Sequence, residues 1–373
     1  MFLNSWNKII DMIKFGNTSL GFYISLFVLI FLTACTSKEQ ANQSGSTDGS
    51  STMTLGNGED NWIIPSPNKQ IQFIIQNQSV EGKAPRLFYR VKFQDELVVE
   101  PSFMGLKRKD QSFGENLTFV GQTPMEVVAS KANLLHGKRA YVSSQANEVQ
   151  LTFKNAEGGK MEVIARAYND GIAFRYRFPE SSETTYTVEE ELTSFDLPEK
   201  GRAWMHPYDS VGKYQPAYET YYEHNLQIGR EADGRLNGWA FPALFNINQS
   251  KHWLLVSEAA VDGHYCGMHL QATATKGNYR LSLPLATEGE GQGAAQPSST
   301  LPWTMPWRFI TIGPNLATIV ESDMVNILAP ASELSDVSWV KPGISSWSWW
   351  SESNSPKNYN LSLIHISEPT RPY

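Results

Sequence analysis

The chain has 373 residues and a formal net charge of −7, with 41% hydrophobic and 18% charged residues. This composition is typical of a globular protein long enough for one large domain or two smaller ones. The acidic balance and the lack of a basic stripe argue against a nucleic-acid partner. The 11 Trp, 15 Tyr and 18 Phe suit a large β core, and they also suit a surface that stacks on sugar rings.

The two cysteines, Cys35 and Cys266, are too few for a disulfide framework. Cys266 lies between His264 and His269, but a metal site there would need more ligands at closer range. We therefore interpret Cys266 as a buried structural thiol.

An apolar run at residues 20–34 follows Lys8 and Lys14. At about 15 residues it is too short for a comfortable membrane span and suits the core of a signal peptide. The run ends in LTAC at Cys35, which resembles a bacterial lipobox, whose cysteine is lipidated and becomes the mature N-terminus. We expect residues 1–35 to be a lipoprotein signal peptide with Cys35 as the lipidation site. The alternative is a transmembrane anchor with a chance cysteine.

Residues 36–61 are rich in Ser, Gly, Thr, Asn and Gln and have almost no large apolar side chains. Such a segment cannot bury a core, so we expect a polar tether. Thr36 follows the lipobox cysteine where an aspartate would retain many lipoproteins at the inner membrane. We therefore expect a lipid-anchored protein of the bacterial cell envelope, in the periplasm or at the outer membrane.

From Trp62 onwards the sequence alternates between apolar and polar residues, as half-buried strands do. Turns are predicted at residues 94–96, 155–159 and 169–171, and the last contains Asp-Gly, which favours a hairpin because glycine adopts positive φ. Further strands are predicted at 253–256, 279–285 and 307–312, and a mobile loop at 289–299. The fold class is mainly β, and residues 62–335 should form one antiparallel sandwich or barrel.

Two features interrupt or follow this pattern. At residues 205–224 the alternation stops, Pro207 and Pro216 break regular structure, and tyrosines gather with acidic and histidine side chains in one loop. At residues 316–328 the apolar positions share one helical face, which predicts a single helix closed by Pro330. Residues 339–350 then read as a new strand that begins another domain.

Six segments, in this order, resemble glycoside hydrolase family 97: SPN at 66–68, ARAYNDGIAFRYRFP at 165–179, AYETYYE at 217–223, NGWAFPALF at 237–245, MPWRFI at 305–310 and KPGISSWSWW at 341–350. The resemblance covers residues 62 to about 360. It implies an N-terminal β-super-sandwich followed by a catalytic (β/α)8 barrel, of which residues 336–360 would hold only the first strand. Residues 361–373 leave the family pattern and resemble a translated sequencing-adapter tail, so we expect a non-native tail on a truncated chain.

The resemblance implies a calcium-dependent α-glucosidase or α-galactosidase that acts on oligosaccharides. In the family the N-terminal domain donates one glutamate to a Ca²⁺ ion beside the active site, and Glu219 best fits that position, with Glu223 as the alternative. Asn237, Gly238 and Trp239 would lie near the substrate. The catalytic carboxylates have no counterpart here, so no catalytic residue is assigned and we expect this chain to be inactive.

Two other interpretations remain open. A non-catalytic carbohydrate-binding lipoprotein would use aromatic side chains such as Trp239 and Tyr218 as stacking platforms. His206 and His224 are a weaker alternative metal pair, for zinc.

Replacing Cys35 with Ser should release the exported protein from the membrane fraction, because serine cannot carry the lipid. Each buried acyl methylene contributes about 0.8 kcal/mol to anchoring, so losing the chains removes the attachment. Cell fractionation with immunoblotting measures the effect, and Cys266→Ser is the matched control that should stay with the membranes. A Cys35→Ser protein that still sediments with membranes would contradict the lipobox interpretation.

Overall fold

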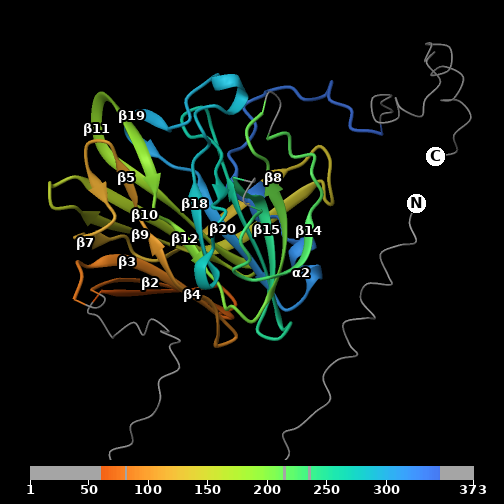
Figure 1. Cartoon of the computed structure of the whole chain (residues 1–373), viewed down its shortest axis with the longest axis horizontal. Coiled ribbons are helices and arrows are strands. Elements are labelled where there is room, and N and C mark those ends of the chain that lie inside the picture. The colour runs from red at the N-terminus through yellow and green to blue at the C-terminus, as the bar shows by residue number, and fades with distance from the viewer. Residues whose placement is uncertain (1–59, 80–81, 213–215, 234–236, 345–373) are drawn as a thin grey trace, which may run out of the picture. The chain divides into compact units, whose positions relative to one another are not determined.

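The computed structural model describes residues 60–79, 82–212, 216–233 and 237–344 (Figure 1). In this part of the chain nearly all regular structure is β, as the sequence predicts. The strands are β1 (Asn61–Pro65), β2 (Ile71–Gln78), β3 (Arg86–Phe93), β4 (Glu96–Met104), β5 (Leu106–Arg108), β6 (Ser112–Phe113), β7 (Thr118–Gln122), β8 (Glu126–Asn133), β9 (Tyr141–Lys154), β10 (Lys160–Tyr168), β11 (Gly171–Glu191), β12 (Ser194–Asp196), β13 (Arg202–Tyr208), β14 (Glu223–Gln227), β15 (Gly238–Ile247), β16 (His252–Ala259), β17 (His269–Leu270), β18 (Asn278–Ser282), β19 (Ser298–Thr304) and β20 (Trp307–Gly313). The helices are η1 (Thr275–Gly277), η2 (Glu288–Gly291), α2 (Leu316–Glu321) and α3 (Met324–Leu328).

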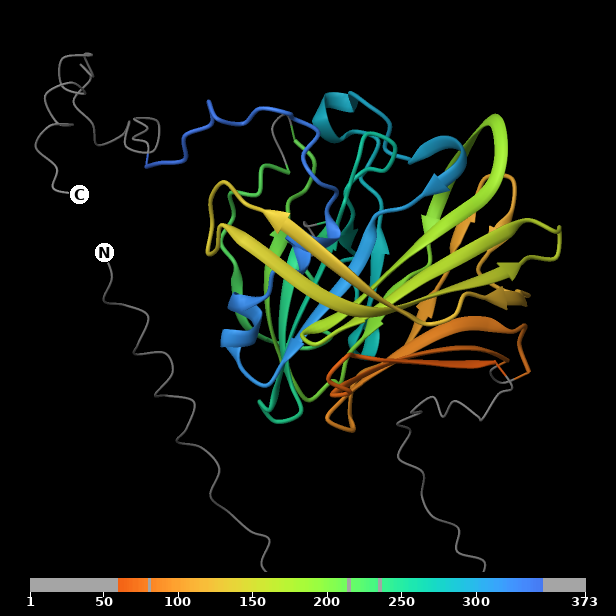
Figure 2. The same cartoon turned by 180° about the vertical axis from the view of Figure 1, so that it is seen from behind.

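The strands form one continuous antiparallel sheet that curls back on itself. Pairing runs from β1 through β2, β3, β4, β12, β18 and β17 to β15, and from β15 through β16, β20, β11 and β10 to β9. The two ends of this path meet, because β1 and β2 contact β10 (Figure 2). This antiparallel, nearly closed sheet confirms the predicted mainly β class.

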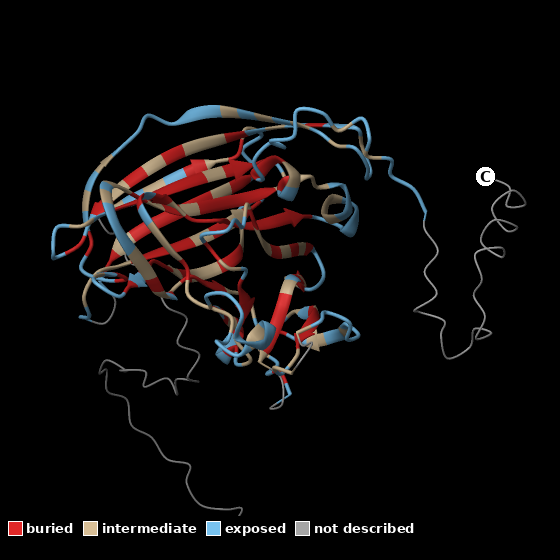
Figure 3. Cartoon of the chain, turned by 90° about the horizontal axis from the view of Figure 1, so that it is seen from above, coloured by how far each residue is buried: buried red, intermediate tan, exposed pale blue. Residues whose placement is uncertain are grey.

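The hydrophobic core lies inside the curled sheet, where buried side chains of β1, β2 and β3 face those of β9 and β11 (Figure 3). Phe174 on β11 packs against Phe73 on β2 at 6.0 Å and against Tyr89 on β3 at 5.1 Å between ring centroids. Trp62 on β1 meets Phe153 on β9 at 5.5 Å, edge to face. These aromatic contacts join strands that are far apart in the sequence, which explains the aromatic-rich composition.

The predicted hairpins form, although one of them uses its glycine differently. Gln94 and Asp95 connect β3 to β4 with φ of 51° and 67°, the left-handed pair that a tight hairpin requires. Gly171 pairs with Tyr168 across the β10–β11 turn, yet its φ is not positive. A side chain at Gly171 would lie 2.2 Å from the carbonyl oxygen of Ile310, so the glycine is needed for the close approach of β20.

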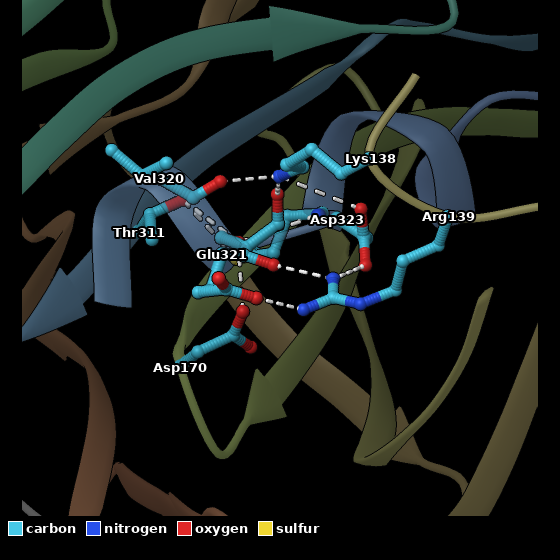
Figure 4. A network of polar contacts seen from close by, with 9 residues as sticks. Lys138, Arg139, Asp170, Thr311, Val320, Glu321 and Asp323 are labelled. Carbon is cyan, nitrogen blue, oxygen red and sulfur yellow. Dashed lines mark hydrogen bonds and ion pairs between the residues drawn. The ribbon is translucent and has the colours of Figure 1, made fainter. Parts of the chain in front are cut away.

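The single helix predicted for residues 316–328 is wrong, because α2 ends at Glu321 and α3 begins at Met324. At the break, Ser322 is extended and its hydroxyl donates to Asp170 at 2.7 Å (Figure 4). Lys138 and Arg139, from the loop after β8, bind backbone carbonyls at the end of α2 and the Asp323 carboxylate. These long-range partners replace the backbone bonds that a continuous helix would have made.

The described part of the predicted barrel strand, residues 339–344, contains no strand. Trp339 is 70% exposed and Ile344 is fully exposed, without the flanking strands that a parallel barrel strand needs. Residues 345–360 lie outside the described residues, as do the predicted signal peptide with Cys35, most of the tether and the tail. Asn61, predicted as the end of the tether, is already in β1. Among the described residues no helix is long and apolar enough to span a bilayer.

A buried ion-pair network joins β20 to β11 and β16. The Arg308 guanidinium on β20, 1% exposed, donates twice to Glu191 at the end of β11, at 2.9 and 2.7 Å, and also to Glu258 on β16. Tyr265 and Thr193 donate to the same Glu191 carboxylate at 2.6 and 2.9 Å. With these donors around it, the pKa of Glu191 is held below its usual value despite burial, which alone would raise it.

Arg308→Met should therefore lower the free energy of unfolding by about 3–5 kcal/mol, because it leaves two carboxylates buried without their cation. Arg86→Met is the matched control, since Arg86 forms a half-exposed pair with Glu115 at 2.7 Å and should cost about 1 kcal/mol or less. Equilibrium denaturation of both variants measures the difference. Equal losses would show that the buried pair has no special role.

Candidate functional site

The polar-aromatic loop, which we define as the described residues 209–212 and 216–222, lies between β13 and β14 in the chain. β13 pairs with β14 and with β15 and shifts register against both between residues 203 and 206. Its last four residues, from Met205 to Tyr208, are all buried, which explains why the alternation stops there. Pro207 was predicted to break regular structure, and this is wrong: it lies within β13, opposite Trp239, beside the register shift that accommodates it.

His206, a buried residue of β13, contacts three side chains of the loop. Its ring is 5% exposed, and Tyr222 packs on it edge to face at 5.1 Å while Tyr218 lies at 6.2 Å. The hydroxyl of Thr220 lies 3.2 Å from His206 Nε2. One buried imidazole on a rigid strand thus contacts every second residue from 218 to 222.

A second stack lies beside the first. Tyr208 and His269 are parallel, with ring centroids 3.9 Å apart, and Tyr208 also meets Tyr218 at 6.0 Å. The Tyr208 hydroxyl donates to the Glu288 carboxylate at 2.7 Å. Burial lowers the pKa of His269, which favours the neutral imidazole. Burial, reinforced by Glu288, raises the pKa of Tyr208, so the phenol stays protonated as a donor.

Glu219 projects from this support into solvent. It lines a shallow depression with Asp209, Ser210 and Thr220, all of which carry side-chain oxygens. Its carboxylate makes no hydrogen bond or ion pair with another described residue. Oxygen donors of this kind suit Ca²⁺, which takes six to eight of them. Among the described residues no group of at least three His, Cys, Asp or Glu side chains could hold a metal, so calcium binding by Glu219 stays a prediction.

The alternative ligands are less well placed. Glu223 is half-buried in β14, opposite Met205. His206 is buried under the tyrosines while His224 is exposed, and no third zinc ligand joins them among the described residues. Cys266 is half-buried rather than buried, donates weakly to the Ala295 carbonyl at 3.4 Å, and has a pKa raised to about 11 by burial, as befits an unreactive thiol.

The predicted substrate residues separate into two groups. Asn237 lies against the site, because its backbone amide donates to the Tyr208 carbonyl at 2.9 Å and its side chain reaches the Asp209 carbonyl at 3.3 Å. Gly238 is buried with φ of 137°, and a side chain there would lie 2.0 Å from the Leu270 carbonyl oxygen. Trp239 is fully buried. Its proposed use as a stacking platform is therefore wrong, since neither face of the indole is accessible.

Sequence reasoning missed His269 and Glu288, which come from β17 and η2, 45 or more residues after the loop. No local pattern marks either of them as part of this site. Tyr208 and His206 were within the predicted segment, but their role as a buried support was not foreseen.

Known proteins similar to this nearly closed antiparallel domain include glycoside hydrolases. The family described as "Glycosyl-hydrolase 97 N-terminal" matches residues 64–330. The chain therefore belongs to glycoside hydrolase family 97, and the match covers the N-terminal domain of that family.

Individual relatives agree with this assignment. A probable retaining alpha-galactosidase of Streptomyces bingchenggensis is 26% identical over 304 residues, which is 81% of this chain and 43% of the relative. The retaining alpha-galactosidase of Bacteroides thetaiotaomicron is 24% identical over 288 residues, covering 72% of this chain and 42% of its own length. This chain thus spans less than half the length of these relatives.

Solved structures of glycoside hydrolases also resemble this chain. A beta-arabinopyranosidase superposes with a TM-score of 0.63 at 29% identity, covering 70% of this chain and 42% of that one. A family 97 enzyme of Pseudoalteromonas sp. strain K8, solved with panose and with acarbose, has a TM-score of 0.61 at 25% identity, covering 76% of this chain and 40% of that one. In each case the aligned part is a minority of a longer enzyme.

Proposed function

We propose that this chain is the N-terminal part of an exported, lipid-anchored, calcium-dependent, exo-acting alpha-glycosidase that hydrolyses oligosaccharides. The family match over residues 64–330 carries the proposal. Two curated relatives are alpha-galactosidases, and the Pseudoalteromonas enzyme was solved with oligosaccharide ligands. The substrate is therefore an alpha-galactoside or an alpha-glucoside.

In this proposal the catalytic carboxylates belong to the part of the relatives that this chain does not span. Glycoside hydrolysis requires a pair of carboxyl groups flanking the scissile bond, and the described loop offers no buried pair facing an open pocket. In this proposal the N-terminal domain forms one wall of the active site, made of β13, β15 and the polar-aromatic loop. Glu219 would hold Ca²⁺ from this wall, and the bound ion would polarise the sugar or set carboxyl pKa values nearby.

Glu219→Gln in the full-length protein should raise the calcium concentration needed for half-maximal activity, because the amide keeps the size of the side chain but loses its charge. A loss of about tenfold in calcium affinity would correspond to about 1.4 kcal/mol. Calcium titrations of the wild type and the variant measure the change. Glu223→Gln is the matched control, and an unchanged titration for Glu219→Gln would remove it from the ligand set.

The proposal also predicts how activity divides between chain segments. Residues 36–360 expressed alone should not hydrolyse aryl alpha-galactosides or aryl alpha-glucosides with calcium present, whereas the full-length gene product should hydrolyse one of them. Turnover by residues 36–360 would show that the catalytic carboxylates lie in this chain. Absence of turnover by the full-length product would contradict the enzymatic proposal.

The second candidate, a non-catalytic carbohydrate-binding lipoprotein, is favoured by one observation. Tyr218, Tyr221 and Tyr222 are 59%, 95% and 41% exposed on the same loop, as a sugar-stacking surface would be. Oligosaccharide binding by a full-length product that hydrolyses neither class of substrate would support this candidate.

A further inference from the structure

The polar-aromatic loop has two sets of side chains with different surroundings. Tyr218, Thr220 and Tyr222 contact the buried His206, as described above. All five residues are exposed, but Glu219 and Tyr221, the residues between them, have no such contact with His206 or another described residue. The buried imidazole therefore fixes alternate residues of the segment and leaves the intervening pair to project outwards.

Tyr221 is the most exposed aromatic side chain among the described residues, at 95%. It makes no ring contact or hydrogen bond with any other described residue. Leaving a whole phenol ring in water forgoes the burial that tyrosine usually obtains in a folded protein. Because its neighbours on both sides are held by His206, the ring is carried on a supported backbone.

We propose that Tyr221 is a sugar-stacking residue that binds an outer unit of the oligosaccharide, beyond the unit that is cleaved. The inference rests on the proposed glycosidase function and deepens it, since it names the residue that favours oligosaccharides over single sugars. The outer unit lies on the Tyr221 ring, and Thr220, the preceding residue, lines the depression that Glu219 also lines.

The surroundings of Tyr221 suit a sugar. A pyranose presents an apolar face of C–H groups and a rim of hydroxyls, so it needs an aromatic face with hydrogen-bonding groups beside it. Thr220, which directly precedes Tyr221, lines a depression together with Asp209, Ser210 and Glu219, and these side chains can supply such groups. A protein-docking surface would instead have a centre depleted of charged residues, and here the exposed Glu219 lies two residues before Tyr221 on the same loop.

The test compares two substrates in the full-length protein. A glycosyl fluoride carries only the sugar that is cleaved, whereas a trisaccharide (raffinose for an alpha-galactosidase, panose for an alpha-glucosidase) also carries outer units. Tyr221→Ala should lower kcat/KM for the trisaccharide by about three- to tenfold, through KM, because one aromatic contact is lost. Its kcat/KM for the fluoride should remain that of the wild type.

Two variants serve as controls. Tyr221→Phe keeps the ring and should retain the wild-type preference for the trisaccharide. Tyr141→Ala removes another tyrosine, 51% exposed on β9, and should change neither substrate. Equal losses on both substrates for Tyr221→Ala, or a lowered melting temperature, would overturn the inference, because they would mean that the ring packs against protein.

A separate measurement distinguishes this inference from the function on which it rests. If the wild type hydrolyses neither substrate, the proposed enzymatic function is wrong. Calorimetric titration with the trisaccharides then still decides the role of Tyr221. Weaker binding to Tyr221→Ala than to Tyr221→Phe would support the stacking role, and equal or absent binding would overturn it.

Discussion

The buried ion pair between Arg308 and Glu191 is the interaction on which the rest of the domain depends. It joins β20 to the end of β11, and through Glu258 it reaches β16. Glu258 in turn accepts the backbone amide of Met268 at 3.0 Å, next to His269. Charges this deeply buried persist only with complete hydrogen bonding, so the surrounding strands and the loop before β17 are held in one arrangement.

The same strands position the residues of the candidate site. His269 stacks on Tyr208, and Tyr208 meets Tyr218 of the polar-aromatic loop. His206, two residues before Tyr208, supports the same loop from below. The loop is therefore irregular in backbone but rests on rigid strands, which is the usual way in which proteins position binding groups precisely. Only its outward side chains remain without partners among the described residues.

Where the sequence predicted structure well, the determining interactions were local. The β3–β4 and β10–β11 hairpins depend on a few adjacent residues and on alternation along each strand. The helical prediction for residues 316–328 failed because Ser322 and Asp323 bond to Asp170 and Arg139, more than 150 residues earlier. Trp239 was misjudged for the same reason: a tryptophan in a loop-flanking motif can be a platform or core, and burial depends on what packs over it.

The sequence by itself determined the mainly β class, most strand positions and the family, because these follow from alternation, turn residues and motif order along the chain. It also identified the loop that holds the candidate site. Only the tertiary structure decided which of its side chains face inwards, and that His269 and Glu288 join it from distant segments. The tertiary structure also decided that Arg308 is buried in an ion pair rather than exposed. The physical reason is that burial and pairing are set by contacts between residues far apart in the chain, and no local pattern encodes them.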